Sequence, residues 1–407
     1  MLGTTSATKA QLKVLFSRQR YCQKHQVIFC NTPPSCFCDC EKAHQTVSDL
    51  APARYKTPAG TRTHVNETYC QNMQNMHIAI IGAGISGLSL YLWLEKLDLT
   101  SRHTITIYEA RPPASTGSSA ESSDVQTSNT SLIGGALGFS PVGWRVLHRL
   151  DPELEGEVLG AGHWMGRWRM SNSRGWALGE TEVVESGGGV FVGRQVFWEC
   201  LRRRVPDSVV VGGKKVVEVK TGPDWCKIMF AEGDEVQADM VVGCDGIWSC
   251  VRTVVLGKEL RPEYIGLTGV GGFVPSSKLA GVRDGEMNVV FGANGFFGYG
   301  YCSSDGTDFR KHGDQAAWWS TYTLAECPTD WRHISCEDAK QQLKERHGIW
   351  KNDAVQRILD DVDIDNVYPT FTTPDLPTWE KEGCVLVGDA AHALQPSKFM
   401  TQTDNCR

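Results

Sequence analysis

The sequence predicts an α/β protein that combines a parallel-sheet region with a second region built mostly from strands. The first observation is an apolar run, His77 to Ile81, that leads through a glycine-rich turn into an apolar pattern at helical spacing. The second is the return of buried strand patterns at 238–243 and 382–388. The third is a change after about residue 256, where strand-like segments rich in glycine and aromatic residues occur at 264–274, 286–301 and 316–323.

The turn after the first strand has the composition of a dinucleotide-binding loop. It consists of Gly82, Ala83, Gly84, Ile85, Ser86 and Gly87. In such a loop the first glycine allows a tight turn, the second lets the backbone approach a pyrophosphate, and the third lets helix and strand pack closely. The helix that follows presents unpaired N–H groups to the phosphates. The alternative is an ordinary glycine-rich turn of another α/β unit.

Glu109 indicates which dinucleotide the loop holds. It follows the second strand, Thr104 to Tyr108, at the carboxyl end where the acid of such a site lies. Its carboxylate can accept hydrogen bonds from both ribose hydroxyls and would repel a 2′-phosphate. The residues therefore predict FAD or NAD at this position, and not NADP.

Composition excludes several classes of protein. The chain has 407 residues, 22% of them charged, and a net charge of −6, which gives no basis for a nucleic-acid surface. No apolar run reaches the roughly 18 residues that span a bilayer. The fifteen cysteines show no framework spacing and are typical of reduced thiols in a cytoplasmic protein.

Residues 1–75 differ from the rest and are expected to form a low-order extension. No acid precedes Asp39, so a mitochondrial presequence is one alternative. An extension joined to an ordinary start at Met76 is the interpretation favoured here. A metal site is a further alternative, although the spacing is not that of paired zinc arms, and it would use Cys30, Cys36, Cys38 and Cys40.

The remaining segments suggest domain boundaries. Helices are expected at 141–150, from Arg194 to about Arg204, at 336–347 and at 353–361, and antiparallel strands at 209–219 and 227–242. The expected domains are a nucleotide-binding domain with inserted strands at 76–255, a sheet-based domain at 256–375, and a return to the first domain at 376–407.

Three separated motifs together resemble the class A flavoprotein monooxygenases, the group of salicylate hydroxylase and para-hydroxybenzoate hydroxylase. They are GAGISG with Glu109 and Arg111, CDGIWSCVR at 244–252, and GDAAHALQP at 388–396. The resemblance runs from about Met76 to Pro396 and points to fungal members that act in secondary metabolism. It implies a Rossmann-like FAD-binding domain of the glutathione-reductase type, interleaved with a mixed β-sheet substrate domain.

The resemblance also implies cofactors and a reaction. FAD is the bound cofactor, NADH or NADPH is a transient reductant, and one oxygen atom of O2 is transferred through a flavin C4a-hydroperoxide. The implied substrate is an aromatic, polyketide-like or terpenoid-like small molecule that is hydroxylated or epoxidised. Oligomeric state is not implied, and no residue is assigned a catalytic role.

Several residues match cofactor-binding positions of that family. The glycine loop matches the pyrophosphate loop, and Glu109 the adenosine ribose acid. The other matched positions are Arg111, Gly135, Arg194, Asp245, Gly246, Asp389 and Pro396. The alternative for Arg194 is an ordinary surface arginine, and the alternative for Asp245 and Gly246 is a plain Asp-Gly turn after a strand. His392 matches a motif histidine, although a packed histidine at a helix end is an equal alternative. A pocket for a flat substrate is expected from Phe296, Phe297, Tyr299, Trp318 and Trp319.

One departure from the family lies near the end of the chain. Ser397 to Gln402 stand where the family has a Gly-Gln-Gly loop and a helix facing the flavin. A truncated chain that holds the flavin ring loosely is therefore one expectation. Two alternative functions stay open: an inactive FAD-binding protein, and a flavin-dependent reductase or oxidase on the same scaffold.

Overall fold

The structure is a computed structural model. It describes residues 75–112, 135–182, 188–293, 295–327, 336–360, 362, 364 and 366–393. The described residues from Met76 onward belong to one compact unit. Residues 1–74, Gly134 and Pro396 lie outside the described residues, so the predictions made for them stay predictions.

A mostly parallel six-stranded sheet forms around β1 (His77–Ile81). Helix α2 (Ile85–Lys96) follows it and leads to β2 (Thr104–Tyr108), so both predicted strands and the helix between them are confirmed. The strand order is β18-β19-β12-β1-β2-β8, and only β18 runs antiparallel to its neighbour. The other strands are β8 (Val210–Val211), β12 (Met240–Gly243), β18 (Glu380–Lys381) and β19 (Cys384–Leu386).

The segment between β8 and β12 corrects one expectation. An antiparallel sheet does form there, from β9 (Val216–Thr221), β10 (Cys226–Phe230) and β11 (Glu235–Ala238). However, the two flanking strands, expected to be antiparallel, pair in parallel with β2 and β1. All four residues of β12 are buried, which is typical of a strand inside a parallel sheet.

A seven-stranded sheet forms the second layer, in the order β17-β13-β16-β15-β14-β5-β6. Its first two strands in the chain, β5 and β6, come from residues before 256, so two separated stretches build this sheet. The strands are β5 (Arg167–Asn172), β6 (Ala177–Glu182), β13 (Glu263–Pro275), β14 (Glu286–Gly292), β15 (Gly295–Tyr301), β16 (Gln315–Thr323) and β17 (Asn366–Thr372).

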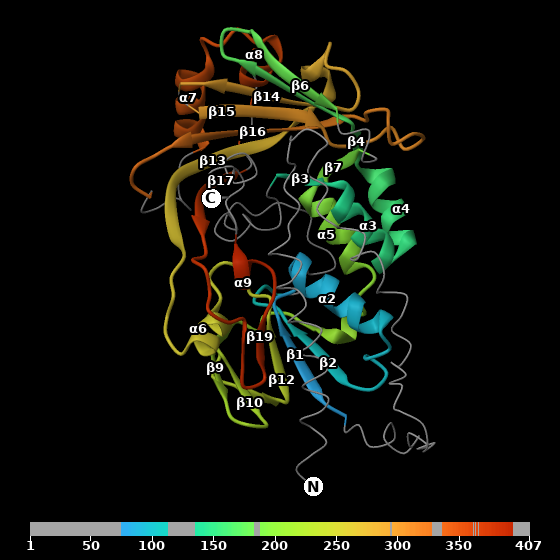
Figure 1. Ribbon diagram of the computed structural model, residues 1–407, viewed down its shortest axis with the longest axis vertical. Coiled ribbons are helices and arrows are strands. Elements are labelled where there is room, and N and C mark those ends of the chain that lie inside the picture. The colour runs from blue at the N-terminus through green and yellow to red at the C-terminus, as the bar shows by residue number, and fades with distance from the viewer. Residues whose placement is uncertain are drawn as a thin grey trace, which may run out of the picture. The chain divides into compact units, whose positions relative to one another are not determined.

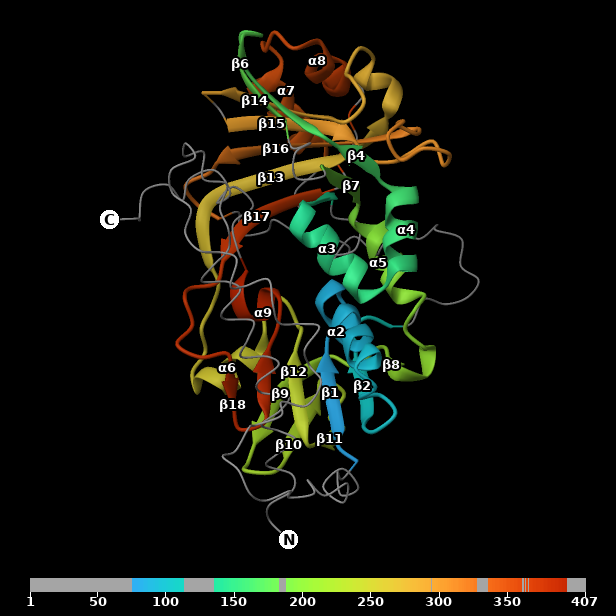
Figure 2. The same ribbon diagram turned by 45° about the vertical axis from the view of Figure 1, so that its right-hand side comes forward.

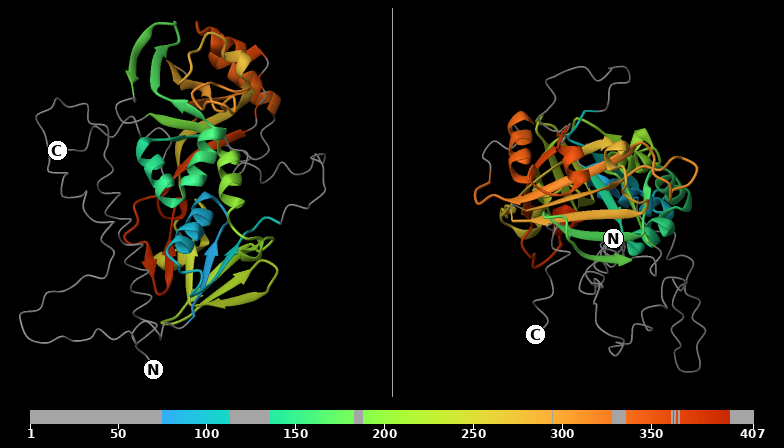
Figure 3. Two further views of the ribbon diagram at one scale, coloured as in Figure 1. Left: turned by 90° about the vertical axis from the view of Figure 1, so that its right-hand side faces the viewer. Right: turned by 90° about the horizontal axis from the view of Figure 1, so that it is seen from above.

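Two layers cover this sheet, one on each side (Figure 1, Figure 2). One side is covered by α7 (Cys336–His347) and α8 (Asp353–Asp360). The other side meets a small antiparallel sheet. Figure 3 shows α7 and α8 at the end of the unit away from β1 and β2. The small sheet consists of β3 (Ala136–Phe139), β4 (His163–Met165) and β7 (Gly189–Gly193).

The remaining helices lie outside these sheets. They are α3 (Pro141–Leu150), α4 (Pro152–Ala161), α5 (Arg194–Arg202), α6 (Cys250–Leu256) and α9 (Asp389–His392), with 3-10 turns at Asp207–Val209 and Ser276–Leu279. Within the described ranges, no helix combines the length and apolar character needed to cross a bilayer.

Candidate cofactor site at the carboxyl ends of the parallel strands

The three sequence motifs meet at the carboxyl ends of β1, β12 and β19, which are neighbours in the parallel sheet. The carbonyl oxygen of Cys244 lies so close to Gly82 that a Cβ atom on the glycine would be 2.5 Å from it. Gly388 approaches the glycine loop in the same way, because a Cβ there would be 2.1 Å from Ser86 Oγ. Ligands of open α/β sheets bind at this end of the strands.

The glycine loop is built for close approach by a ligand. Gly82 has a φ of +104°, which favours glycine. A Cβ on Gly87 would lie 2.0 Å from the carbonyl oxygen of Gly82, so the helix can begin this close to the strand only with glycine. Gly84 is different: it is exposed, and a Cβ there would meet nothing within 4 Å. No side chain caps the start of α2, so its first N–H groups stay available for an anion.

Glu109 lies against this loop. Its Oε2 accepts a hydrogen bond from the backbone N–H of Ala83 at 2.8 Å, and its Oε1 accepts one from the N–H of Arg111 at 3.0 Å. The carboxylate is half-buried. The structure thus brings together the acid and the glycine loop, two of the predicted cofactor-binding elements.

Asp245 fixes the start of α6 from the end of β12. Its Oδ2 accepts hydrogen bonds from the N–H groups of Cys250 at 2.8 Å and Val251 at 3.2 Å. Burial raises the pKa of the carboxyl, and the hydrogen bonds oppose that shift. Its Oδ1 is buried and has no hydrogen-bond partner among the described residues. The adjoining Gly246 has a φ of +77° and open space on its Cβ side.

Arg252 is a residue of the second motif to which the sequence analysis gave no role. The side chain is 1% exposed. Its guanidinium donates hydrogen bonds to the carbonyl oxygens of Ile247 at 2.6 Å, Ala390 at 3.1 Å and Leu260 at 3.3 Å. It therefore ties the loop after β12 to α9. The sequence signal was its position three residues after the helix cap Ser249, whose Oγ accepts the N–H of Arg252.

Arg194 and Gly135 lie side by side. The backbone N–H of Arg194 donates to the carbonyl oxygen of Gly135 at 3.0 Å. Gly135 has a φ of +64° and open space around its Cβ position. Farther along α5, the indole N–H of Trp198 donates to the carbonyl oxygen of Ala83 at 2.8 Å, which connects this helix to the glycine loop. Trp198 was not among the predicted residues.

Asp389 and His392, both in the third motif, have different surroundings. Asp389 begins α9 and is exposed. His392 is at the other end, with its ring 5.4 Å from that of Trp379, and burial lowers its pKa. The surroundings of His392 thus agree with a packed histidine at a helix end, one of the two alternatives considered for it.

The predicted aromatic pocket is only partly correct, because its residues lie on opposite faces of the seven-stranded sheet. We call the face toward α7 and α8 the outer face and the face toward β3, β4 and β7 the inner face. Phe297, Tyr299 and Trp318 are buried on the outer face, where the rings of Phe297 and Trp318 stack at 5.5 Å. Phe296 and Trp319 are on the inner face and half-buried. Side chains alternate along a strand, so neighbours in sequence point apart.

The inner face carries no charged side chain along its central strands. The register and the packing clusters define its side chains. They include Leu267 and Phe273 of β13, Met287, Val289 and Phe291 of β14, Phe296 of β15, Gln315, Ala317, Trp319, Thr321 and Thr323 of β16, and Tyr368 of β17.

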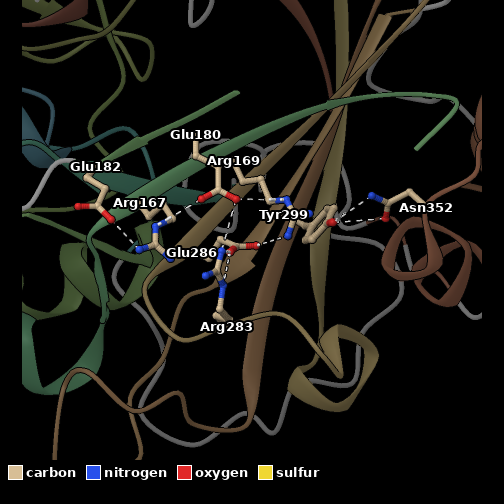
Figure 4. Close-up of polar contacts among 8 residues, drawn as sticks. All are labelled: Arg167, Arg169, Glu180, Glu182, Arg283, Glu286, Tyr299 and Asn352. Atoms are coloured by element: carbon tan, nitrogen blue, oxygen red, sulfur yellow. Dashed lines mark hydrogen bonds and ion pairs between the residues drawn. The ribbon is translucent and has the colours of Figure 1, made fainter. Parts of the chain in front are cut away.

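The outer face carries a charged network at the edge formed by β5, β6 and β14 (Figure 4). Glu286 is 5% exposed and accepts hydrogen bonds from Arg283. Arg169 lies between two carboxylates: its Nη1 is 3.9 Å from Oε1 of Glu286, and its Nε is 3.8 Å from Oε1 of Glu180. Arg167 pairs with Glu182 at 2.7 Å, and nearby the hydroxyl of Tyr299 donates to Oδ1 of Asn352 at 3.3 Å.

Known proteins resemble this chain in sequence and in fold. Residues 229–399 match a family model described as FAD binding domain. The chain is 25% identical over 332 residues to 6-hydroxynicotinate 3-monooxygenase of Pseudomonas fluorescens, covering 79% of this chain and 78% of that protein. It is 25% identical to salicylate hydroxylase of Pseudomonas putida, covering 79% and 72%. HpxO of Klebsiella pneumoniae, solved with FAD and uric acid, has a TM-score of 0.63 at 18% identity, covering 79% and 74%.

Proposed function

We propose, on the premise that this chain belongs to the class A FAD-dependent aromatic-ring monooxygenases, that it hydroxylates or epoxidises a small aromatic molecule with O2 and NADH or NADPH. The observation that carries the proposal is the meeting of three motifs at the carboxyl ends of β1, β12 and β19. Relatives of this chain are named for the hydroxylation of 6-hydroxynicotinate and salicylate, both of them small aromatic compounds.

The described residues fit FAD. The uncapped start of α2 and the open space at Gly84 suit a pyrophosphate, which needs N–H donors and room for close approach. Glu109 is positioned to accept ribose hydroxyls, exchanging its hydrogen bond to Ala83 or sharing its free lone pairs. Asp389, exposed at the start of α9, supplies a second acceptor for hydroxyl groups of the cofactor.

Four further residues of the proposed site lie where they can contact FAD, and a fifth holds two motifs together. Gly135, which has open space on its Cβ side, lies beside the cation Arg194, and in our proposal the two contact the flavin chain. Asp245 and Gly246 follow a buried strand, and the buried, unpartnered Oδ1 of Asp245 leaves one acceptor for a hydroxyl or amide donor. Arg252 holds this loop against α9, so the second and third motifs keep a fixed position relative to each other.

When bound, reduced flavin supplies the activation of O2, and the protein residues bind, orient and exclude water. This division of labour agrees with the inner face, where apolar and aromatic side chains predominate and the central strands carry no charged side chain. Several described cysteines are not disulfide-bonded, namely Cys200, Cys244, Cys250, Cys302 and Cys384, which suits a reducing compartment, and we place the protein in the cytosol.

The test is a reconstitution with FAD followed by oxygen labelling. The purified protein is loaded with FAD, and oxidation of NADH and NADPH is followed with and without aromatic compounds. We expect oxidation that depends on the aromatic compound and one atom of label from ¹⁸O2 in the product. Oxygen uptake without any aromatic compound, and a product free of label, would instead identify a flavin-dependent reductase or oxidase.

A charge reversal tests the position of FAD. Glu109→Arg replaces the proposed ribose acceptor with a group that only donates, so FAD affinity should fall at least about tenfold. Glu95→Arg makes the same change on the exposed side of α2 and serves as the matched control. Equal FAD affinity of the two variants in a fluorescence titration would remove Glu109 from the site.

A further inference from the structure

The seven-stranded sheet sorts its charges onto one face. Along β5 and β14 the outer face presents Arg167, Arg169 and Glu286. The residues between them in sequence, such as Trp168 and Met287, point to the inner face and are apolar. The lack of charge on the inner face is therefore a property of that face, and not of the strands as a whole.

Two aromatic rings of the inner face lie close to the backbone of a neighbouring strand, at positions where that strand has glycine. The indole of Trp319 lies over Gly298, whose Cβ, if present, would be 2.2 Å from the ring. The phenol ring of Tyr368 lies over Gly269 at the same distance. Both residues keep part of their surface accessible. The ring of Trp319 also contacts that of Phe191 in β7, with centroids 5.9 Å apart and planes tilted by 58°, and its accessible part can contact a flat ligand ring.

The accessible part of the inner face forms a row across four strands. The register places Tyr368 beside Gly269, Gly269 beside Thr321, and Thr321 beside Phe296. Four neighbouring strands span about 14 Å at about 4.8 Å per step. That width suits a molecule of one to three fused rings.

The polar groups of this row are two hydroxyls, those of Thr321 and Tyr368. Burial raises the pKa of Tyr368 to about 12, so the phenol stays neutral at physiological pH. Neutral hydroxyls can donate to or accept from a phenol, ketone or amide of a ligand. They cannot neutralise a carboxylate, and an ionised carboxylate is costly to remove from water without a cation.

Among the described residues, the cation Arg194 follows Gly193 at the start of α5, next to this face. A Cβ on the adjacent Gly193 would lie 3.8 Å from the ring of Phe273. The proposed function already assigns Arg194 to the cofactor, whose phosphates carry negative charge. It therefore does not serve as the partner of a substrate carboxylate.

We propose that the row formed by Tyr368, Thr321 and Phe296, with Trp319 beside it, binds a flat, uncharged aromatic substrate and discriminates against aromatic carboxylates. This inference rests on the proposed function, because it names the substrate class of the same site. It assigns Trp319 and Tyr368 as stacking residues and Thr321 as the residue that sets the charge preference.

The first test compares neutral and anionic ligands of equal shape. The probes are salicylamide with salicylate, and 3-hydroxy-2-naphthamide with 3-hydroxy-2-naphthoate. Affinity is measured on the FAD-loaded protein from quenching of tryptophan fluorescence and from the flavin difference spectrum, both independent of turnover. We expect each amide to bind at least about tenfold more tightly than its acid. Equal or tighter binding of the acids, or no binding of either amide, would overturn the proposal.

A positive charge added to the row should make the protein prefer the acids over the amides. Thr321→Arg places a guanidinium beside Gly269 and Phe296, where it can pair with a carboxylate. We expect its affinity for the acids to rise about tenfold and its affinity for the amides to fall. Thr181→Arg adds the same charge on the exposed edge strand β6 and is the matched control. An unchanged amide-to-acid ratio in Thr321→Arg, in protein that melts as the wild type does, would contradict the assignment.

A second pair of variants tests stacking. Trp319→Ala should weaken the naphthamide more than the salicylamide, because the larger ring overlaps more of the indole. Trp176→Ala removes an indole that is 65% exposed on the β5–β6 hairpin and should leave both affinities unchanged. Equal losses for the two amides in Trp319→Ala would argue against a stacking role.

The outcomes separate this inference from the proposed function. Preferred binding of neutral rings without any oxygen transfer would retain the substrate class and reject the monooxygenase. Oxygen transfer to acids in preference to amides would retain the monooxygenase and reject the substrate class.

Discussion

The inner and outer faces of the seven-stranded sheet come from the same strands and yet differ in the burial of their aromatic side chains and in their charge. The outer face buries Phe297 and Trp318 under α7 and α8 and places its charges at one edge. The inner face leaves Trp319 and Phe296 half-buried and carries no charge along its central strands. Packing thus stabilises one face, while the other face keeps accessible aromatic surface. The comparison separates residues that hold the fold from residues that are available to a ligand.

The largest expected effect compares two adjacent tryptophans. Trp318→Ala should lower the free energy of unfolding by about 3–5 kcal/mol, because it leaves a cavity in a closed core. Trp319→Ala should cost under about 2 kcal/mol, because its side chain is already partly in water. Urea unfolding of both variants measures the difference. Equal losses of stability would mean that the inner face is as closed as the outer face.

The next effect is a pH dependence from the outer face. His347 is fully buried, hydrogen-bonded to Ser320 Oγ at 2.7 Å, and burial lowers its pKa to about 4. Below about pH 6.5 the unfolded chain therefore binds a proton more readily than the folded chain. The free energy of unfolding should fall by roughly 3 kcal/mol from this group between about pH 6.5 and pH 4.

The variant His347→Gln isolates this contribution, because buried His163, with a pKa of about 4, titrates in the same window. Unfolding curves at several pH values should show that the free energy of unfolding falls less steeply with decreasing pH in the variant than in the wild type. Affinity for a neutral aromatic ligand should stay constant over this range while the protein is folded. A slope identical to that of the wild type would show that His347 does not titrate in this way.

A smaller effect is expected within the charged network. Glu286→Gln removes a buried charge that accepts hydrogen bonds from Arg283 and should cost about 1–2 kcal/mol. Glu182→Gln removes an exposed partner of Arg167 and should cost under about 0.5 kcal/mol. Thermal unfolding of both variants gives the comparison. A larger loss of stability in Glu182→Gln than in Glu286→Gln would show that burial does not determine how much an ion pair of this network stabilises the protein.

Local pattern was sufficient for the nucleotide-binding half of the fold. The strands at 77–81 and 104–108 and the helix between them follow from apolar period and glycine spacing, because these elements form from neighbouring residues. Glu109 was found from the same spacing, and the structure places it against Ala83.

The sheet was harder to predict because its faces depend on long-range pairing. Phe297 and Trp318 were assigned to the same pocket as Phe296 and Trp319, since composition alone does not tell which face a side chain occupies. The parallel pairing of β8 and β12 depends on strands more than 100 residues away in sequence for each pair. Arg252 was missed because its role depends on Ala390, which only the fold brings close.

The central claim, that the glycine loop holds FAD, is tested most directly by the FAD affinity of Gly84→Ala. A Cβ at Gly84 meets nothing within 4 Å and the backbone there is extended, so the fold should tolerate the change. The added methyl group would occupy the space through which the pyrophosphate approaches. Gly156→Ala on α4, also with open space, is the matched control. We expect neither variant to melt below the wild type, since alanine is favoured over glycine inside a helix such as α4, and at least about tenfold weaker FAD binding in Gly84→Ala alone; wild-type FAD affinity in that variant would contradict the account.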